Sequence, residues 1–263
     1  MSVVILRNQV VHYEVLGRGK PVLFLHGWVG SWRYWVPAMQ TASIAFRTYA
    51  LDLWGFGDTA KTAERYSLNA QVELVQEFLS VMGIGKIAFV GHGLGALVAL
   101  QFASQTPQQV DRLLLIGLPL KPTRLNGRLA SANVADLAEW LLTEADAVSE
   151  AARLEARKAD FQAIRASVEA LQDVSFDQSL LFLSIPSLLV YGFNDPLVLL
   201  PEGEELAHLP QSAHWMVLDS CAHYPMLEES AKFNRLLMDF LNLNSGQSPR
   251  ELQLKEEWKR RVR

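Results

Sequence analysis

The chain of 263 residues has a single cysteine, Cys221, so no disulfide can form within it. No apolar run reaches the roughly 18–20 residues that a membrane-spanning helix needs. The formal net charge of −4 provides no excess of positive charge for binding nucleic acid or an anionic membrane. Residues Met1 to Leu6 are followed at once by Arg7 and Asn8, so we expect no secretory signal. These absences favour a cytoplasmic location.

The remaining composition is that of an ordinary globular enzyme. Hydrophobic residues make up 50% of the chain and charged residues 20%. A length of 263 residues is near the upper end for one hydrophobic core, and α/β folds commonly reach it. No cluster of histidine, cysteine and acidic residues has metal-ligand spacing, so we expect no metal and no cofactor.

Short apolar runs alternate with helical patterns along most of the sequence. Several runs are apolar throughout, such as Leu113–Ile116, which is typical of strands buried on both faces of a mostly parallel sheet. The alternation predicts an α/β fold with a doubly wound sheet, and the polar–apolar pattern of Gln9–Val15 predicts an antiparallel edge strand. The expected strands are Gln9–Val15, Pro21–His26, Phe46–Asp52, Ile87–Gly91, Arg112–Gly117, Ser187–Gly192 and His214–Asp219, and the expected core helices are Ser67–Met82, Leu94–Gln105 and Leu227–Leu243.

Residues 118–183 interrupt this alternation. They contain no convincing strand, and their pattern predicts two helices, over Val134–Ala145 and Val148–Val174. We expect this insertion to form a helical cap, a lid over a core made of residues 1–117 and 184–243. The alternative is a structural excursion with no part in a substrate pocket.

The C-terminal segment, residues 244–263, differs in character from the rest. A small and polar linker is followed by Arg250–Arg263, which has six Lys or Arg against three Glu. Leu254, Trp258 and Val262 recur every fourth residue and would form one apolar stripe on a helix. Docking on its own domain or on a second subunit is favoured over docking on a membrane, because so short a stripe gives little membrane affinity.

The stretch Gly91-His92-Gly93-Leu94-Gly95 follows an apolar run and begins a helix. At such a strand-to-helix turn the central residue takes a strained positive φ, and its neighbours two positions away must be small because strand and helix nearly touch. Gly91 and Gly95 meet that demand. A plain tight turn is the alternative. A phosphate site is discounted, since it needs G-x-G-x-x-G near the first strand.

An acid and a histidine follow the last two buried strands. Asp195 lies just after Ser187–Gly192, and His223 lies just after His214–Asp219. Each alone is unremarkable. It is improbable by chance that both residues follow expected strands and that the turn, the acid and the histidine occur in this order.

These residues resemble the α/β-hydrolase superfamily over nearly the whole chain apart from the basic tail. Within it the likeness is to the lid-bearing esterase, epoxide hydrolase and haloperoxidase-like group. The matching motifs are His26-Gly27-Trp28-Val29-Gly30-Ser31, Asp52-Leu53-Trp54-Gly55-Phe56-Gly57, Gly91-His92-Gly93-Leu94-Gly95, Asp195 and His223. The resemblance implies an eight-stranded, mostly parallel sheet with a helical cap.

The resemblance also implies a role for each site residue. Asp195 would orient His223, which would be the general base. The backbone N–H groups of Trp28 and Leu94 would form the oxyanion hole. Gly93 would occupy the position of the nucleophile, where the family's G-x-S-x-G motif has serine.

Gly93 departs from the family's pattern. Glycine has no side chain, so it can form no covalent intermediate. An aspartate would indicate a dehalogenase or an epoxide hydrolase, and glycine supports neither. Cys221, Ser31 and His92 are unconvincing replacements. A natural loss is favoured over an introduced substitution, because alanine or cysteine would be commoner choices for silencing an enzyme.

Three functions therefore stay open. The chain could be an ester- or acyl-cleaving family member whose acyl-enzyme chemistry is lost or strongly impaired. It could be a pseudoenzyme or receptor that binds a small molecule without turnover. Third, the pair Asp195–His223 could activate water without a covalent intermediate, since serine proteases that lose a triad member keep a residual rate of about 10³–10⁴ over water.

Aromatic residues near the expected strand ends and in the cap indicate an apolar pocket for a small uncharged molecule. The expected lining residues are Trp35, Phe56, Trp140 and Phe193. Each alone is more typical of a core side chain, and it is the grouping that indicates a pocket.

Overall fold

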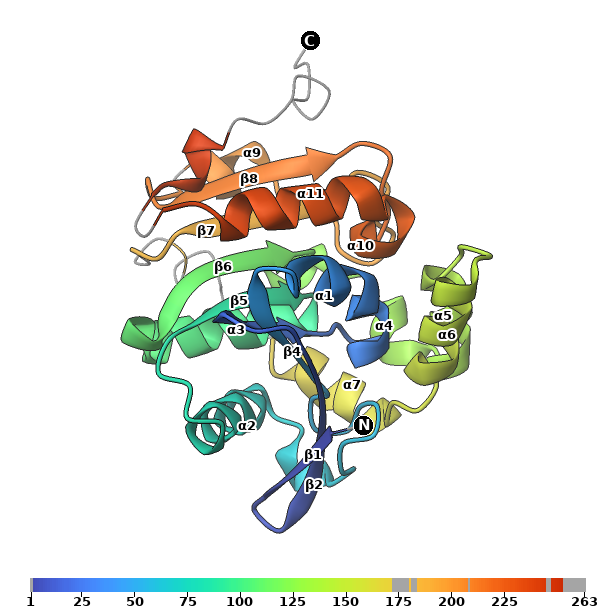
Figure 1. Cartoon of the computed structure of the whole chain (residues 1–263). Coiled ribbons are helices and arrows are strands. Elements are labelled where there is room, and N and C mark those ends of the chain that lie inside the picture. The colour runs from blue at the N-terminus through green and yellow to red at the C-terminus, as the bar shows by residue number, and fades with distance from the viewer. Residues whose placement is uncertain (1, 172–179, 181–183, 208, 245–246, 253–263) are drawn as a thin grey trace.

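A computed structural model describes residues 2–171, 180, 184–207, 209–244 and 247–252. Eight strands form one sheet in the order β1-β2-β4-β3-β5-β6-β7-β8 (Figure 1). β1 pairs antiparallel with β2, and β2 with β4, whereas all other neighbours are parallel. The strands are β1 (Ser2–Leu6), β2 (Gln9–Leu16), β3 (Lys20–Leu25), β4 (Phe46–Leu51), β5 (Ile87–His92), β6 (Val110–Ile116), β7 (Ser187–Gly192) and β8 (Ala213–Leu218). The predicted mostly parallel sheet is confirmed.

Helices cover both faces of this sheet (Figure 1). α1 packs against α11, and α2 packs against α3, which in turn contacts β3, β5 and β6. The described helices of the core are α1 (Val36–Ala42), α2 (Leu68–Val81), α3 (Leu94–Gln105), α9 (Gly203–Ala207), α10 (Pro225–Glu228) and α11 (Ser230–Leu241). Within the described residues, no helix is long and apolar enough to cross a membrane.

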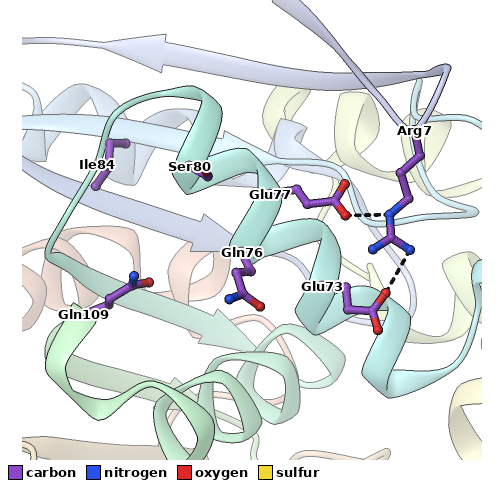
Figure 2. A pocket seen from close by; sticks show the side chains of 7 residues that line it. All are labelled: Arg7, Glu73, Gln76, Glu77, Ser80, Ile84 and Gln109. Carbon is purple, nitrogen blue, oxygen red and sulfur yellow. Dashed lines mark hydrogen bonds and ion pairs between the residues drawn. The ribbon is translucent and has the colours of Figure 1, made fainter.

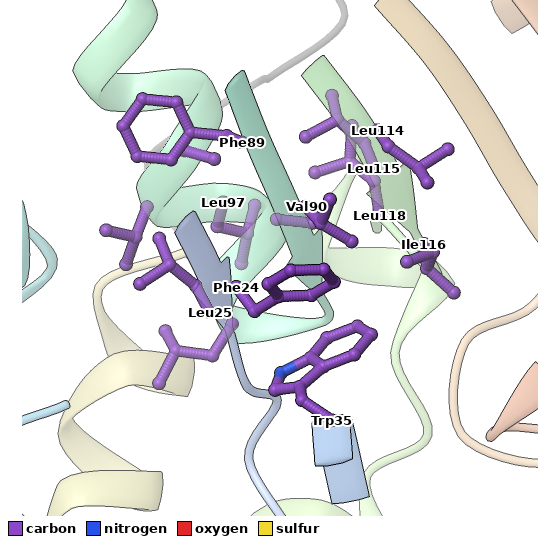
Figure 3. Close-up of a cluster of buried hydrophobic side chains, with 14 of the residues drawn as sticks. Phe24, Leu25, Trp35, Phe89, Val90, Leu97, Leu114, Leu115, Ile116 and Leu118 are labelled. Carbon is purple, nitrogen blue, oxygen red and sulfur yellow. The ribbon is translucent and has the colours of Figure 1, made fainter. Parts of the chain in front are cut away.

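The core lies along the central parallel strands (Figure 3). Phe24 of β3 is opposite Val90 of β5, which is opposite Leu114 of β6, and all three side chains are fully buried. Each such side chain contributes about 1.5–3 kcal/mol when removed from water. This row fixes the register of β3, β5 and β6, and therefore the positions at which the three strands end.

The prediction that Gln9–Val15 forms the sheet edge is wrong. β2 lies between β4 and an additional strand, β1, which is the actual edge. Arg7 and Asn8 make the connecting turn with φ of 49° and 62°, the left-handed conformation that a two-residue hairpin turn requires. The side chains of Val3 and Ile5 remain exposed on the outer strand, so this segment gave no buried-strand pattern in the sequence.

The described residues between β6 and β7 are mostly helical, and Leu125 among them forms an isolated β-bridge with Val198. They form α4 (Arg128–Ser131), α5 (Val134–Leu141), α6 (Ala147–Ala156) and α7 (Phe161–Glu169). The single helix expected over Val148–Val174 is wrong, because the chain turns between α6 and α7. Asp160 causes the break: its side chain caps α7 and its N–H donates to Gly55 O at 2.7 Å.

The start of the expected linker and tail packs on the core. Ser248 Oγ donates to Gln211 O at 2.6 Å, and Arg250 Nε donates to Ala213 O at 3.0 Å, at the beginning of β8. The stripe of Leu254, Trp258 and Val262 lies outside the described residues.

Candidate active site

The turn after β5 has the geometry that its glycines predict. Gly93, between β5 and α3, has φ 50° and donates its N–H to Ile116 O at 2.9 Å. A Cβ on Gly91 would lie 2.5 Å from Gly95 O, and a Cβ on Gly95 would lie 2.3 Å from Leu25 O. Neither position can accept a side chain without moving backbone, so both flanking glycines are sterically required.

Asp195 and His223 meet at the carboxyl ends of β7 and β8. His223 Nδ1 lies 2.9 Å from Asp195 Oδ2, and both side chains are buried. The other carboxylate oxygen, Oδ1, accepts the N–H groups of Leu197 at 2.8 Å and Val198 at 3.0 Å, which fixes the acid in place. Because a carboxylate only accepts, Nδ1 carries the imidazole proton and Nε2 is left as the acceptor.

His223 Nε2 is buried and has no hydrogen-bond partner among the described residues. A buried polar atom without a partner is costly unless a ligand, water or substrate engages it. The pair therefore has the form of an oriented general base whose reactive nitrogen is available.

Glu228 holds the loop that carries His223, and the sequence analysis missed it. Its Oε1 accepts the Tyr224 N–H at 2.9 Å, and its Oε2 accepts the Ala222 N–H. Burial raises the pKa of Glu228 above its usual value. The only signal in the sequence is an acid in the first turn of the helix that begins at Pro225.

His92 packs directly against His223, with ring centroids 4.4 Å apart. Its Nδ1 accepts the Tyr34 hydroxyl at 3.0 Å, and the same hydroxyl oxygen accepts the Gly27 N–H at 2.7 Å. Burial, and next the proximity of His223, lower the pKa of His92 well below its usual value. His92 is therefore a neutral link between the base and the His26–Ser31 loop, and neither it nor Tyr34 was expected in that role.

Trp28 lies beside the turn. Its side chain is fully buried, and a Cβ on Gly93 would come within 3.1 Å of its Cε3 and Cζ3 atoms. The Tyr224 hydroxyl donates to the carbonyl of the next residue, Val29. Trp28 thus lies against Gly93, and Leu94 follows Gly93 as the first residue of α3; their assignment as oxyanion donors stays a prediction.

The aromatic residues expected to line a pocket differ in their surroundings, and their role as a pocket lining stays a prediction. Trp35 packs in the hydrophobic core, 5.2 Å from the Phe24 ring (Figure 3). Phe56 is fully buried, with its ring 5.0 Å from that of His26. The remaining two lie farther out in the fold: Trp140 on α5 is half-buried beneath the guanidinium of Arg128, and Phe193 is 45% exposed.

Of the three residues weighed as a replacement nucleophile, Cys221 and Ser31 are not suited to that role, and His92 is the buried neutral histidine described above. Cys221 is fully buried, and burial raises the pKa of its thiol to about 12, so it is not a thiolate at neutral pH. Ser31 is buried and accepts the Arg33 N–H at the start of a short helix.

One group of potential metal ligands exists among the described residues: His12, Asp52 and Asp58. Its acceptors are already used. Asp52 Oδ2 lies 2.8 Å from His12 Nδ1 and accepts the Asp58 N–H at 3.1 Å, and Oδ1 accepts the Trp32 N–H at 2.8 Å. The cluster serves to order the loops after β3 and β4.

A surface cavity of about 410 Å³ lies beside α2, and Gly93, Asp195 and His223 are not among the residues that line it (Figure 2). Arg7 lies at one end of it and pairs with Glu73 at 2.9 Å and with Glu77 at 2.5 Å. Its lining residues are Arg7, Glu73, Gln76, Glu77, Ser80, Ile84 and Gln109. The charged side chains that line the cavity are therefore paired with one another.

Comparison with known proteins agrees with the observed fold. A putative carbamate hydrolase, RutD, of Yersinia enterocolitica is 26% identical over 274 aligned positions, which cover 94% of this chain and 97% of the relative. The solved enol-lactonase of Burkholderia xenovorans has a TM-score of 0.81 at 19% identity, covering 92% of this chain and 100% of the other.

A second solved structure is similar to the same extent. It is a serine-to-glycine mutant of the N-acyl homoserine lactonase AidH complexed with N-hexanoyl homoserine lactone, with a TM-score of 0.78 at 19% identity, covering 91% of this chain and 96% of the other. At these identities the solved structures establish the fold. The model of the alpha/beta hydrolase fold family matches residues 20–154, just over half of the sequence, and the chain belongs to that family.

Proposed function

We propose that this protein binds a small, largely apolar acyl compound at the carboxyl end of β5 and is unable, or poorly able, to cleave it through an acyl-enzyme. The observation that carries the proposal is the combination of an intact pair, Asp195–His223, with a residue 93 that has no side chain. The base is oriented and its Nε2 is unpartnered, but no described neighbour offers an atom for it to activate. Binding and polarisation of a carbonyl group would survive, and covalent attack would not.

The chemistry left to the site follows from the groups that glycine does not remove. Backbone N–H groups of Trp28 and Leu94 would still stabilise negative charge on a carbonyl oxygen, because they do not depend on the side chain at position 93. An ester, lactone or carbamate would therefore be held by its carbonyl group, with its apolar part against buried aromatic residues.

Similar proteins support this substrate class. The carbamate hydrolase and the enol-lactonase are named for small carbonyl compounds, and the homoserine lactonase mutant was solved with an N-acyl lactone. In the last case a protein with serine replaced by glycine forms a complex with the lactone. We propose the same class of ligand here.

The test is to introduce the missing nucleophile. Gly93→Ser is compared with the native chain and with Gly93→Ala on short p-nitrophenyl esters and small lactones. We expect Gly93→Ser alone to release a stoichiometric burst of p-nitrophenolate, as the serine oxygen attacks the carbonyl and His223 takes its proton. A folded Gly93→Ser variant that is no faster than Gly93→Ala across the panel would contradict the proposal.

A second function is favoured by the free Nε2 of His223. That nitrogen could take a proton from water, which would then attack the bound carbonyl without a covalent intermediate. Slow turnover by the native chain that disappears in His223→Ala would support this function. Turnover that His223→Ala leaves unchanged would exclude it. A ligand that raises the melting temperature and is recovered intact would identify a receptor.

A further inference from the structure

The side chain of Trp28 crowds the position that a Cβ on residue 93 would take. A Cβ built on Gly93 would lie 3.1 Å from both Cε3 and Cζ3 of the indole and 3.5 Å from Gly27 Cα. Such contacts are tighter than ordinary van der Waals distances, so the indole would have to move by a few tenths of an ångström. Whether it can move decides whether serine is tolerated.

α7 holds the indole in place. Trp28 Nε1–H donates to Ser167 Oγ at 2.8 Å, and Ser167 Oγ–H donates to Ile164 O at 2.7 Å. All three residues are fully buried or nearly so. The serine hydroxyl is directed at the helix carbonyl, which leaves its lone pair facing the indole, so both groups have one preferred geometry.

α7 is in turn fastened to the core. The Tyr66 hydroxyl donates to Asp160 Oδ2 at 2.7 Å, and the Asp160 N–H donates to Gly55 O at 2.7 Å. Ala163 packs so closely over Gly55 that a Cβ on that glycine would lie 2.5 Å from the Ala163 Cβ. The indole therefore cannot shift far unless its hydrogen bond to Ser167 breaks or α7 moves with it.

We propose that Trp28 is the residue that determines which side chain position 93 accepts, and that its hydrogen bond to Ser167 keeps the position closed. Glycine fits because the indole, held by its hydrogen bond to Ser167, lies closer to position 93 than the ordinary van der Waals distance of a Cβ. The inference rests on the proposed function, because it concerns the same turn. It adds that installing a serine is not enough for efficient acylation, since the indole must also be shortened or released.

The test compares Gly93→Ser with the double variants Gly93→Ser/Trp28→Leu and Gly93→Ser/Ser167→Ala. Leucine keeps the backbone N–H of position 28 and removes the ring. Alanine at position 167 removes only the hydroxyl that accepts the indole N–H. The readout is the rate of the p-nitrophenolate burst from p-nitrophenyl acetate, which reports acylation. We expect the burst to be about tenfold faster with Trp28→Leu than in Gly93→Ser alone, and several-fold faster with Ser167→Ala.

The matched control is Gly93→Ser/Trp215→Leu, which removes a partly exposed tryptophan of β8 and should leave the burst rate of Gly93→Ser unchanged. Equal burst rates in Gly93→Ser and both double variants would overturn the role of Trp28 and leave the proposed function standing. No burst in any folded variant would overturn the proposed function itself. If Trp28→Leu prevents folding, Gly93→Ser/Ser167→Ala decides, and an unchanged burst rate there overturns the inference.

Discussion

Replacing His92 with asparagine should remove a pH-dependent penalty on folding. His92 is fully buried, and burial together with the neighbouring His223 lowers its pKa well below the usual value of 6.5. The unfolded chain therefore takes up a proton at position 92 as the pH falls below about 6.5, and the folded chain does not. Because the unfolded state binds more protons, the native protein loses stability on acidification, and this stability is fully present only above that pH.

The size of the effect follows from the two protonation states. At about pH 5.5 the unfolded histidine gains roughly RT ln 11, or about 1.4 kcal/mol, that a folded neutral histidine cannot match. Asparagine does not titrate, and its side-chain oxygen can still accept the hydroxyl of Tyr34. His92→Asn should be less stable than the native chain at about pH 8, since it loses a packed ring, and that difference should shrink by about 1.4 kcal/mol at about pH 5.5.

The measurement is the free energy of unfolding in urea at several pH values, for both proteins under the same conditions. Other titrating groups contribute nearly equally to the free energy of unfolding of both proteins, so they largely cancel when the two free energies are subtracted. Tyr34→Phe is the control, because it breaks the same hydrogen bond without removing a group that titrates in this range, so its cost should not change with pH. Parallel stability curves for His92→Asn and the native chain would refute the assignment of His92 as a buried neutral histidine.

Two further predictions concern thiol reactivity and backbone packing. Cys221 is buried with a thiol pKa of about 12, so Ellman's reagent should leave the folded chain unmodified and titrate it fully in denaturant; rapid labelling of the native protein would contradict that burial. Gly192→Ala would place a Cβ 1.8 Å from Ala222 O and should cost more than about 3 kcal/mol in thermal unfolding. Gly203→Ala, in α9 with nothing within 4 Å, should be neutral or stabilising by up to about 1 kcal/mol, and equal losses in the two variants would refute the steric argument.

The central fold could be predicted because its strands are apolar on both faces. Runs such as Leu113–Ile116 have few alternatives to a buried parallel strand, and the structure places them there. β1 was missed because a strand at the sheet edge buries only part of its surface, so Val3 and Ile5 can remain exposed. The break before α7 was missed for another reason: α6 ends at Ala156, and Asp160, which caps α7, is held by a contact with Gly55 about a hundred positions away in the sequence.

The candidate site likewise has a part that the sequence predicts and a part that it does not. The order Gly93, Asp195, His223 follows from strand ends, which a sequence reveals, and the Nδ1–Oδ2 contact of 2.9 Å agrees with it. The residues that support the site do not show in any local pattern. Trp28 reaches Ser167 across 139 positions, and Tyr224 reaches the Val29 carbonyl across 195. Such partners are determined by how loops and inserted helices pack, and no spacing rule encodes that packing.

Two independent demands fall on position 93, and glycine satisfies both. The backbone demand is the φ of 50°, at which a residue with a side chain is strained by about 1–3 kcal/mol. The steric demand comes from the indole of Trp28, which is held by Ser167 and lies 3.1 Å from where a Cβ would be. A serine could tolerate the backbone strain and still supply a nucleophile, but its Cβ would require the indole to move by a few tenths of an ångström. The indole and the glycine therefore form one packed unit, and efficient covalent chemistry here needs changes on both sides of the contact.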